Sequence, residues 1–347
     1  MTQESLDQDI LFEQRGAAGI VTLNRPKALN ALTHAMALAL ARQLDLWAED
    51  SAIRCVVVQG AGERAFCAGG DIRRLYDLAQ AGRFDEQLAF WHDEYLLNAR
   101  IKTYPKPYVA LVDGIVMGGG VGVSIHGSHC VAGDRFQFAM PEVGIGFFPD
   151  VGATYALPRL PGEVGTYCAL TGARLNQADA ADLGLVRAAV RSADFPALID
   201  DLAAGQDADA AVAARALPPA PGPLRDSRPL VDTCFAAASV EEILALLDKA
   251  AAPGPELAAT IRAKSPISLK IALRQMRCGR DLAFAAAMRT EFRIVSRLAH
   301  GHDFYEGVRA LIIDKDNAPR WSPATLEAVS AADVERHFAP IDRELPL

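Results

Sequence analysis

The chain has 347 residues, of which 51% are hydrophobic and 22% charged, and its formal net charge is −8. This composition is typical of a globular protein and excludes a disordered or fibrous chain, and the dispersed basic residues do not favour nucleic acid as a partner. The six cysteines form no CxxC pair, the segment MTQESLDQDILFEQ resembles neither a signal nor a transit peptide, and no apolar run could span a membrane. We therefore expect a cytoplasmic protein with no membrane partner.

The N-terminal residues predict a hairpin, a helix and a buried strand in that order. Asp9–Gln14 and Gly19–Leu23 form the hairpin with a turn at Gly16, and Thr33 is the expected N-cap of the helix. The apolar residues of this helix recur every three to four positions, at Met36, Leu40, Leu44 and Trp47. The β-branched run Ile53–Gln59 is typical of a buried strand.

The alternation of strands and helices continues through the next segments. Asp71 is placed to cap a short helix, and Gln87–Lys102 is predicted to be a longer one. Tyr108–Asp113 is the next expected strand, and a helix is expected over Val121–His126. This alternation of buried strands with helices predicts an α/β layer architecture.

The second half of the chain is predicted to be mainly helical from about Gly162. Five prolines in residues 216–230 indicate a segment without regular structure. Beyond it we expect three or four helices, one of which opens with a capping box of Ser239 and Glu242. The predicted division is an α/β core over residues 1–215, a proline-rich connector over 216–230 and a helical C-terminal region over 231–347.

Two glycine-rich loops, Ala65–Ile72 and Ile115–Gly122, each follow a predicted strand. Glycine lets a backbone approach a ligand closely, and one N–H donor from each loop would form an oxyanion hole for a thioester oxygen. The alternative is that both loops are ordinary tight turns. A dinucleotide-binding reading of the second loop is rejected, because Val123 stands where that fingerprint requires Gly or Ala.

Four segments resemble the enoyl-CoA hydratase/isomerase, or crotonase, superfamily in order and spacing: NRPKALNAL, RAFCAGGDI, PKPYVALVDGIVMGGGVG and FAMPEVGIGFFPDVGAT. The resemblance implies a crotonase (ClpP-like) fold of repeated ββα units with a helical C-terminal region. It implies an acyl-CoA substrate, no separate cofactor or metal, and a possible homo-oligomer. Carried over by position, the oxyanion-hole amides are those of Gly70 and Gly119. The residues that line the coenzyme A channel are Lys27, Ala28, Ala68 and Asp71.

The carboxylates decide which member of the superfamily the chain resembles. A hydratase positions one water molecule between two carboxylates. The family's first hydratase glutamate corresponds to Gly122 here, whereas the second is present as Glu142. The hydration machinery is therefore incomplete.

The segment HDEYLLN, the pair Glu142 and Asp150 eight residues apart and, above all, the C-terminal half add a closer resemblance, to the 3-hydroxyisobutyryl-CoA hydrolase branch of the superfamily. The stretches that carry it are HDEYLLN, CFAAASVEEIL, SPISLKIALRQM and HGHDFYEGVRALIIDKDNAPRW. The resemblance places the substrate-contacting residues at Glu94, Gly119, Glu142 and Asp150. Glu142 could attack the thioester carbonyl directly or act as general base on a water molecule, while Asp150 and Glu94 hold the substrate's hydroxyl group or orient Glu142.

Each of these residues also has a purely structural interpretation when it is considered alone. Glu142 could belong to a turn, Asp150 could cap a helix, and Glu94 could lie on a solvated helix face. His126 and His129 lack a third ligand motif, so we interpret them as structural rather than as metal ligands.

We therefore expect hydrolysis of 3-hydroxyisobutyryl-CoA, a step of valine breakdown, with Glu142, Asp150, Gly70 and Gly119 as the catalytic set. The first alternative is an enoyl-CoA hydratase or isomerase in which Asp150 replaces the missing carboxylate. The second alternative is a non-catalytic acyl-CoA-binding protein.

Overall fold

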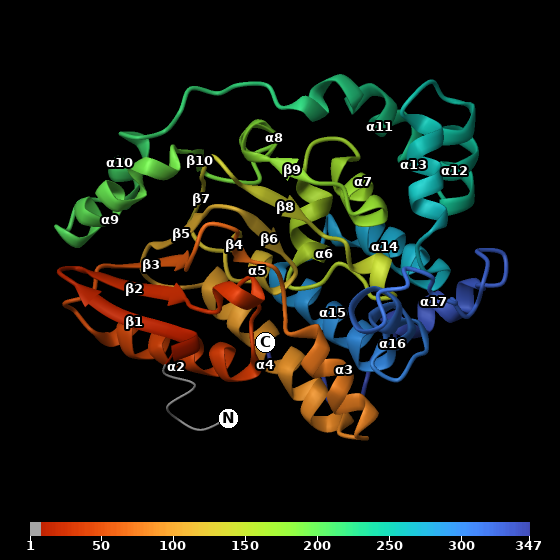
Figure 1. Ribbon diagram of the computed structural model, residues 1–347, viewed down its shortest axis with the longest axis horizontal. Coiled ribbons are helices and arrows are strands. Elements are labelled where there is room, and N and C mark those ends of the chain that lie inside the picture. Colours follow the sequence, from red (N-terminus) through yellow and green to blue (C-terminus); the bar gives the residue numbers. More distant parts are fainter. Residues whose placement is uncertain (1–7) are drawn as a thin grey trace. The chain divides into compact units, whose positions relative to one another are not determined.

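The computed structural model describes residues 8–347 (Figure 1), so the first half of the acidic N-terminal segment lies outside the described residues. Contacts within the chain define two compact units. The first contains the described residues up to Asp71 together with Asp93–Phe138 and Leu175–Pro223. The second contains Ile72–His92, Ala139–Arg174 and Leu224–Leu347. The division predicted from the sequence, into 1–215, 216–230 and 231–347, stays a prediction.

The first unit contains two sheets (Figure 1). The larger has the order β1-β2-β3-β5-β7-β10, with β1 Ile10–Arg15, β2 Ala18–Leu23, β3 Cys55–Gly60, β5 Tyr108–Val112, β7 His129–Ala132 and β10 Ala188–Ala189. The smaller has the order β4-β6-β8-β9, with β4 Ala65–Cys67, β6 Ile115–Met117, β8 Gln137–Ala139 and β9 Leu175–Asn176. The β1–β2 pair is antiparallel, which confirms the predicted hairpin, and the pairs from β2 to β10 are parallel.

Burial explains why the central strands have no polar alternation. Val56, Val57 and Val58 of β3 are fully buried, and so is every residue of β5, as expected for parallel strands covered on both faces. The helix α2 (His34–Glu49) packs on β1, and the Thr33 hydroxyl accepts a hydrogen bond from the Met36 amide, which confirms the predicted cap.

The helices of the first unit beyond α2 are short, apart from α4, whose residues are shared between the two units. They are η1 Pro26–Ala28, α4 Phe84–Lys102, α5 Gly119–Gly122, α8 Gln177–Asp182, η4 Ser192–Asp194, α9 Phe195–Ala203 and α10 Ala208–Ala213. The expected helix over Val121–His126 is wrong, because α5 begins on the glycines and ends at Gly122. At Ser124 the hydroxyl donates to the Gly120 carbonyl oxygen at 2.7 Å, whereas the backbone amide donates to the Val121 carbonyl at 3.1 Å, so the regular helical hydrogen-bond pattern is interrupted there.

The second unit is mainly helical. Its elements are α3 Ile72–Gln80, η2 Glu142–Ile145, α6 Ala153–Ala156, η3 Leu157–Arg159, α7 Val164–Thr171, η5 Pro223–Ser227, α11 Arg228–Cys234, α12 Val240–Lys249, α13 Gly254–Arg262, α14 Pro266–Gly279, α15 Phe284–Leu298, α16 Asp303–Val308, the π-helix η6 Arg309–Ile313 and α17 Ala331–Phe338; the first residue of η5, Pro223, is the last residue of the first unit. The region after residue 230 therefore contains more helices than the three or four expected.

Two further expectations for the C-terminal half need correction. The proline-rich segment is not irregular throughout, because η5 forms within it and α11 begins in it. Pro229 lies in the first turn of α11, where no backbone donor is needed. Only half of the predicted capping box forms. Ser239 accepts from the Glu242 amide, but the Glu242 carboxylate accepts from the Ala238 amide instead of the Ser239 amide.

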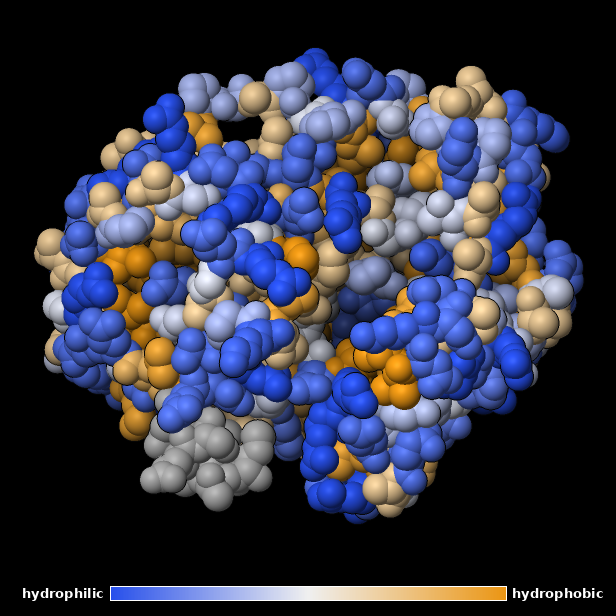
Figure 2. Space-filling model, in the orientation of Figure 1, coloured by the Kyte–Doolittle hydropathy of each residue, from blue (hydrophilic) through white to orange (hydrophobic). Residues whose placement is uncertain are grey.

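Hydrophilic residues cover most of the visible face in Figure 2, and the hydrophobic residues form small patches, one of them over the β1–β2 region. Large exposed hydrophobic side chains among the described residues are limited to Leu11, Leu38, Leu46, Leu246 and Leu311. Within residues 8–347, the helices are all too short or too polar to cross a lipid bilayer.

Candidate functional site

The two glycine-rich loops lie together because their strands are parallel neighbours. β4 pairs with β6, with Ala65 opposite Ile115 and Cys67 opposite Val116, so the loops that follow leave the sheet at the same edge. Gly118 takes φ 45° and ψ −125°, a conformation that only glycine adopts readily, and this turn directs the chain into α5.

The second loop approaches the first at Gly70 and Gly119. A methyl group built on the Cα of Gly119 would lie 3.4 Å from the amide nitrogen of Gly70 and 3.5 Å from the carbonyl carbon of Gly69. Gly119 is also the first residue of α5, where backbone N–H groups have no partner within the helix. The structure therefore places Gly119 beside Gly70, the two residues whose amides are the predicted donors of an oxyanion hole.

The segment that follows β2 holds the first loop in place. The Leu32 amide donates to the Gly69 carbonyl at 2.8 Å, and the Asp71 amide donates to the Leu32 carbonyl at 2.9 Å. Buried Asn30 supports the same segment, because its side-chain amide donates to the carbonyls of Ala61 and Ala65 at 2.9 Å each. The position of Gly70 is thus set by a network of backbone hydrogen bonds.

Glu94 lies against this pair of loops. Its side chain projects from α4, is 2% exposed, and places Oε1 only 2.5 Å from the methyl position at Gly119. The solvated-face interpretation of Glu94 is therefore wrong. Glu94 thus lies beside Gly119, and its contact with the substrate stays a prediction.

The residues predicted to line the coenzyme A channel lie on the segment that follows β2 and on the first glycine-rich loop. Lys27 and Ala28 are exposed in η1, and the Ala68 amide donates to the Leu29 carbonyl at 3.0 Å. Asp71 is partly exposed and accepts from the Arg25 guanidinium at 3.0 Å. The cluster is assembled, and its role in coenzyme A binding stays a prediction.

Glu142 belongs to the second unit and opens the short helix η2. The helix α16 backs this turn, because side chains added at Gly146 or Gly307 would collide with the backbones of Asp303 and Ile145 respectively. The Ser265 amide also donates to the Val143 carbonyl at 3.2 Å. Segments from the C-terminal half of the sequence therefore fix the turn that carries Glu142.

The Glu142 carboxyl group is buried in surroundings that disfavour its charge. It is 7% exposed, and among the described residues its Oε2 atom has no hydrogen-bond partner. Burial, with a smaller contribution from the Asp150 carboxylate, raises the pKa of Glu142 well above its ordinary 4.5. A carboxylate with a raised pKa is a stronger base near neutral pH, which fits a role in proton transfer.

Asp150 lies on the turn between η2 and α6 and is 5% exposed. Its backbone carbonyl accepts from the Ala153 amide at 2.9 Å, as expected for a residue that precedes a helix. Its charge acts on the pKa of Glu142 and also on that of Glu291. Glu142 and Asp150 therefore form part of one acidic group in the second unit.

Glu291 and Gln275 are buried polar residues of this region that the sequence analysis missed. Both are fully buried, Glu291 in α15 and Gln275 in α14. Each lies more than 100 positions from the turn it contacts, so no local spacing could reveal it. The only signal in the sequence was a polar residue within the apolar periodicity of each helix.

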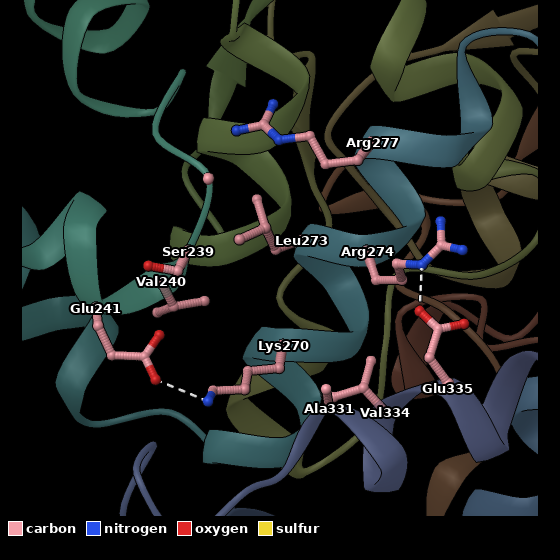
Figure 3. A pocket seen from close by; sticks show the side chains of 11 residues that line it. Ser239, Val240, Glu241, Lys270, Leu273, Arg274, Arg277, Ala331, Val334 and Glu335 are labelled. Atoms are coloured by element: carbon pink, nitrogen blue, oxygen red, sulfur yellow. Dashed lines mark hydrogen bonds and ion pairs between the residues drawn. The ribbon is translucent and has the colours of Figure 1, made fainter.

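A separate cavity of about 260 Å³ lies in the second unit between the start of α12, α14 and α17 (Figure 3). The basic residues of α14 that line it are already paired. Lys270 contacts Glu241 at 2.7 Å, Arg274 contacts Glu335 at 2.7 Å, and Arg277 contacts Glu163 at 2.8 Å. No predicted site residue lines this cavity.

Comparison with known proteins identifies the family. The model of the enoyl-CoA hydratase/isomerase family matches residues 18–338. The chain belongs to the enoyl-CoA hydratase/isomerase family. This confirms the resemblance stated from the four motifs, and the recurring order of two strands and a helix (β1-β2-α2, β3-β4-α3, β5-β6-α5) is the repeat that the crotonase fold implies.

Full-length relatives within the enoyl-CoA hydratase/isomerase family carry a more specific name. The chain is 44% identical to the mitochondrial 3-hydroxyisobutyryl-CoA hydrolase of Danio rerio, over 100% of this chain and 94% of that protein. It is 42% identical to the enzyme of the same name from Xenopus tropicalis, over 96% of this chain and 90% of that protein. A crystal structure of a carnitinyl-CoA dehydratase from Mycobacterium thermoresistibile is 44% identical, has a TM-score of 0.93, and matches 97% of this chain and 98% of its own.

These relatives also correct one expectation. Both hydrolases are named as mitochondrial, which contradicts the cytoplasmic location predicted for this family member. Composition and cysteine content indicated only a reducing compartment, and they do not distinguish the cytosol from other such compartments.

Proposed function

We propose that the chain hydrolyses 3-hydroxyisobutyryl-CoA to 3-hydroxyisobutyrate and free coenzyme A. The observation that carries this proposal is the full-length likeness to two relatives named for that activity. Two further observations support it: Gly70 and Gly119 lie beside each other, and Glu142 is a buried carboxyl group with a raised pKa.

The chemistry assigns a distinct role to each group. The amides of Gly70 and Gly119 stabilise the oxyanion that forms when the thioester carbonyl is attacked. A carbon–oxygen bond forms, the carbon–sulfur bond breaks, and the leaving thiolate takes up a proton. Glu94 and Asp150 bind the substrate's hydroxyl group or orient Glu142.

Two routes use the same Glu142 carboxylate. As general base it removes a proton from water and returns it to the thiolate. As nucleophile it forms a mixed anhydride and releases the thiol, after which water hydrolyses the anhydride. Both routes require the ionised form, so activity rises with pH through the raised pKa of Glu142.

A hydratase or dehydratase is the second candidate, because the structural relative from Mycobacterium thermoresistibile is named a carnitinyl-CoA dehydratase. This reaction needs a second carboxylate, and Gly122, at the position of the family's first hydratase glutamate, has no side chain to provide one. Hydrolysis is therefore the reaction we favour.

One pair of assays separates the candidates. We expect the purified protein to release free thiol from 3-hydroxyisobutyryl-CoA and to leave the chromophore of crotonyl-CoA unchanged. Loss of the chromophore without thiol release would contradict the proposal. Glu142→Gln should abolish thiol release while acyl-CoA binding persists, whereas Glu86→Gln, on the exposed side of α4, should behave as wild type.

Three finer points belong to the same proposal. The predicted contacts of coenzyme A are with Lys27, Ala28, Ala68 and Asp71. Single variants at these positions test them through the affinity of the protein for free coenzyme A. A place in valine breakdown follows from the proposed substrate. A homo-oligomer stays a prediction, for which analytical ultracentrifugation is the direct measurement.

A further inference from the structure

The turn that carries Asp150 contains a strained backbone. Val151 has φ 51°, in the left-handed region, and Gly152 follows with φ 90°. A β-branched residue disfavours this conformation strongly, because its side chain crowds the neighbouring carbonyl groups. Such a conformation persists only where the surrounding contacts enforce it, and it is common at functional sites.

Two buried side chains provide those contacts. The Glu291 carboxylate accepts from the Gly152 amide through Oε2 and from the Thr154 amide through Oε1, each at 2.8 Å. Gln275 holds the other side of the turn, since its Nε2 donates to the Pro149 carbonyl at 3.0 Å and to the Thr154 hydroxyl at 2.8 Å. The helices α14 and α15, which carry the two side chains, both contact α6 (Figure 1).

The carboxylate of Glu291 is poorly explained as a device for stability alone. It is 0% exposed, and burial, with the Asp150 carboxylate as the second cause, raises its pKa to about 8. A buried carboxyl group beside the Asp150 carboxylate is costly to ionise, and the short helix α6 could be capped by a neutral polar side chain instead. The feature that Glu291 does fix is the backbone on both sides of Val151, and therefore the direction of the adjacent Asp150 side chain.

We propose that Glu291, assisted by Gln275, is a positioning residue that holds Asp150 in its catalytic orientation by clamping residues 149–154. This inference rests on the proposed hydrolase function only for the role of Asp150. The clamp itself is a property of the second unit, and its effect on the backbone can be measured without substrate.

The decisive variant is Glu291→Gln, which keeps the size of the side chain but replaces one acceptor oxygen with a donor. At pH 9, where the wild-type carboxylate is ionised, we expect kcat to fall about 100-fold, the scale of a misplacement of roughly 1 Å. KM should stay within about three-fold, because only the alignment of the reacting groups changes. Hydrogen exchange in peptides that cover residues 147–156 should become faster. The control is Glu344→Gln, which alters the partner of Arg293, a residue of α15 like Glu291. It should leave both kcat and hydrogen exchange in residues 147–156 unchanged.

A folded Glu291→Gln protein with wild-type kcat would overturn the inference, and so would a loss of kcat with unchanged exchange in 147–156. If that variant does not fold, Gln275→Leu tests the same clamp from α14. Wild-type kcat in Gln275→Leu would also overturn the inference. Absence of thiol release by the wild-type protein would instead refute the proposed hydrolase function, and the exchange measurement would still decide whether the clamp exists.

Discussion

Replacing Gly119 with alanine tests the oxyanion hole most directly. The added methyl group would stand 3.4 Å from the Gly70 amide nitrogen, close to where an oxygen bound by that amide must lie. It would also meet Glu94 Oε1 at 2.5 Å, a contact that can be relieved because a carboxylate is the far end of a flexible side chain. We therefore expect a folded protein whose oxyanion hole is obstructed.

The expected loss follows from the value of one oxyanion-hole donor. Blocking such a donor costs about 3 to 4 kcal/mol of transition-state stabilisation, which corresponds to a fall of roughly 100- to 1,000-fold in kcat. Thiol release from 3-hydroxyisobutyryl-CoA measures kcat, and thermal unfolding measures stability in the same sample. Wild-type kcat in folded Gly119→Ala protein would refute the assignment of this amide.

The neighbouring glycine is a matched control with the opposite expected behaviour. A methyl group on Gly120 would collide with the backbone carbonyl of Cys67, which cannot move without displacing β4. Gly120→Ala should therefore lower the free energy of unfolding by about 3 kcal/mol or more through overpacking. The two alanine substitutions together separate an effect on the ligand position from an effect on the fold.

Three further outcomes are expected. In a single turnover in ¹⁸O-labelled water, the general-base route places ¹⁸O from the solvent in the first product molecule. If Glu142 attacks instead and water then cleaves the anhydride at the carboxyl carbon of Glu142, the first product carries an unlabelled oxygen from the enzyme. Mass spectrometry of the first product distinguishes the two routes. Above pH 4.5 the native state retains the Glu291 proton while the unfolded state does not, so the free energy of unfolding should fall between about pH 5 and 8, by at most about 5 kcal/mol from this group. Urea titrations at several pH values should show that the free energy of unfolding falls less steeply with pH in Glu291→Gln than in the wild type. An equal pH dependence in the two proteins would contradict the raised pKa. Asn30→Ala removes two buried hydrogen bonds donated by the side-chain amide and the acceptor of the Arg25 amide, at a residue with φ 56°. It should therefore lower the free energy of unfolding by about 3 to 5 kcal/mol. A loss below about 1 kcal/mol would be inconsistent with the role of Asn30 in supporting the first glycine-rich loop.

Local sequence was sufficient where local physics controls the structure. The two short strands joined by the Gly16 turn, the Thr33 cap and the continuous β-branched run of β3 specify elements that the structure confirms. The helix after the GGG loop was misplaced, because a hydroxyl-to-carbonyl hydrogen bond from Ser124 ends it early. Helix boundaries of this kind depend on a single competing side-chain donor, which periodicity does not reveal.

The glycine loops and Glu142 were recognisable from their order along the chain, because backbone freedom and residue type are properties of the sequence itself. Their electrostatic surroundings were not. The raised pKa of Glu142 arises from burial and from Asp150, and the clamp on Asp150 comes from Glu291, 139 positions away from Gly152. Sequence alone thus determined the family, many of the elements and the reactive residue types. Tertiary structure decided which groups are buried together, because desolvation and hydrogen bonding between distant segments exist only once the chain has folded.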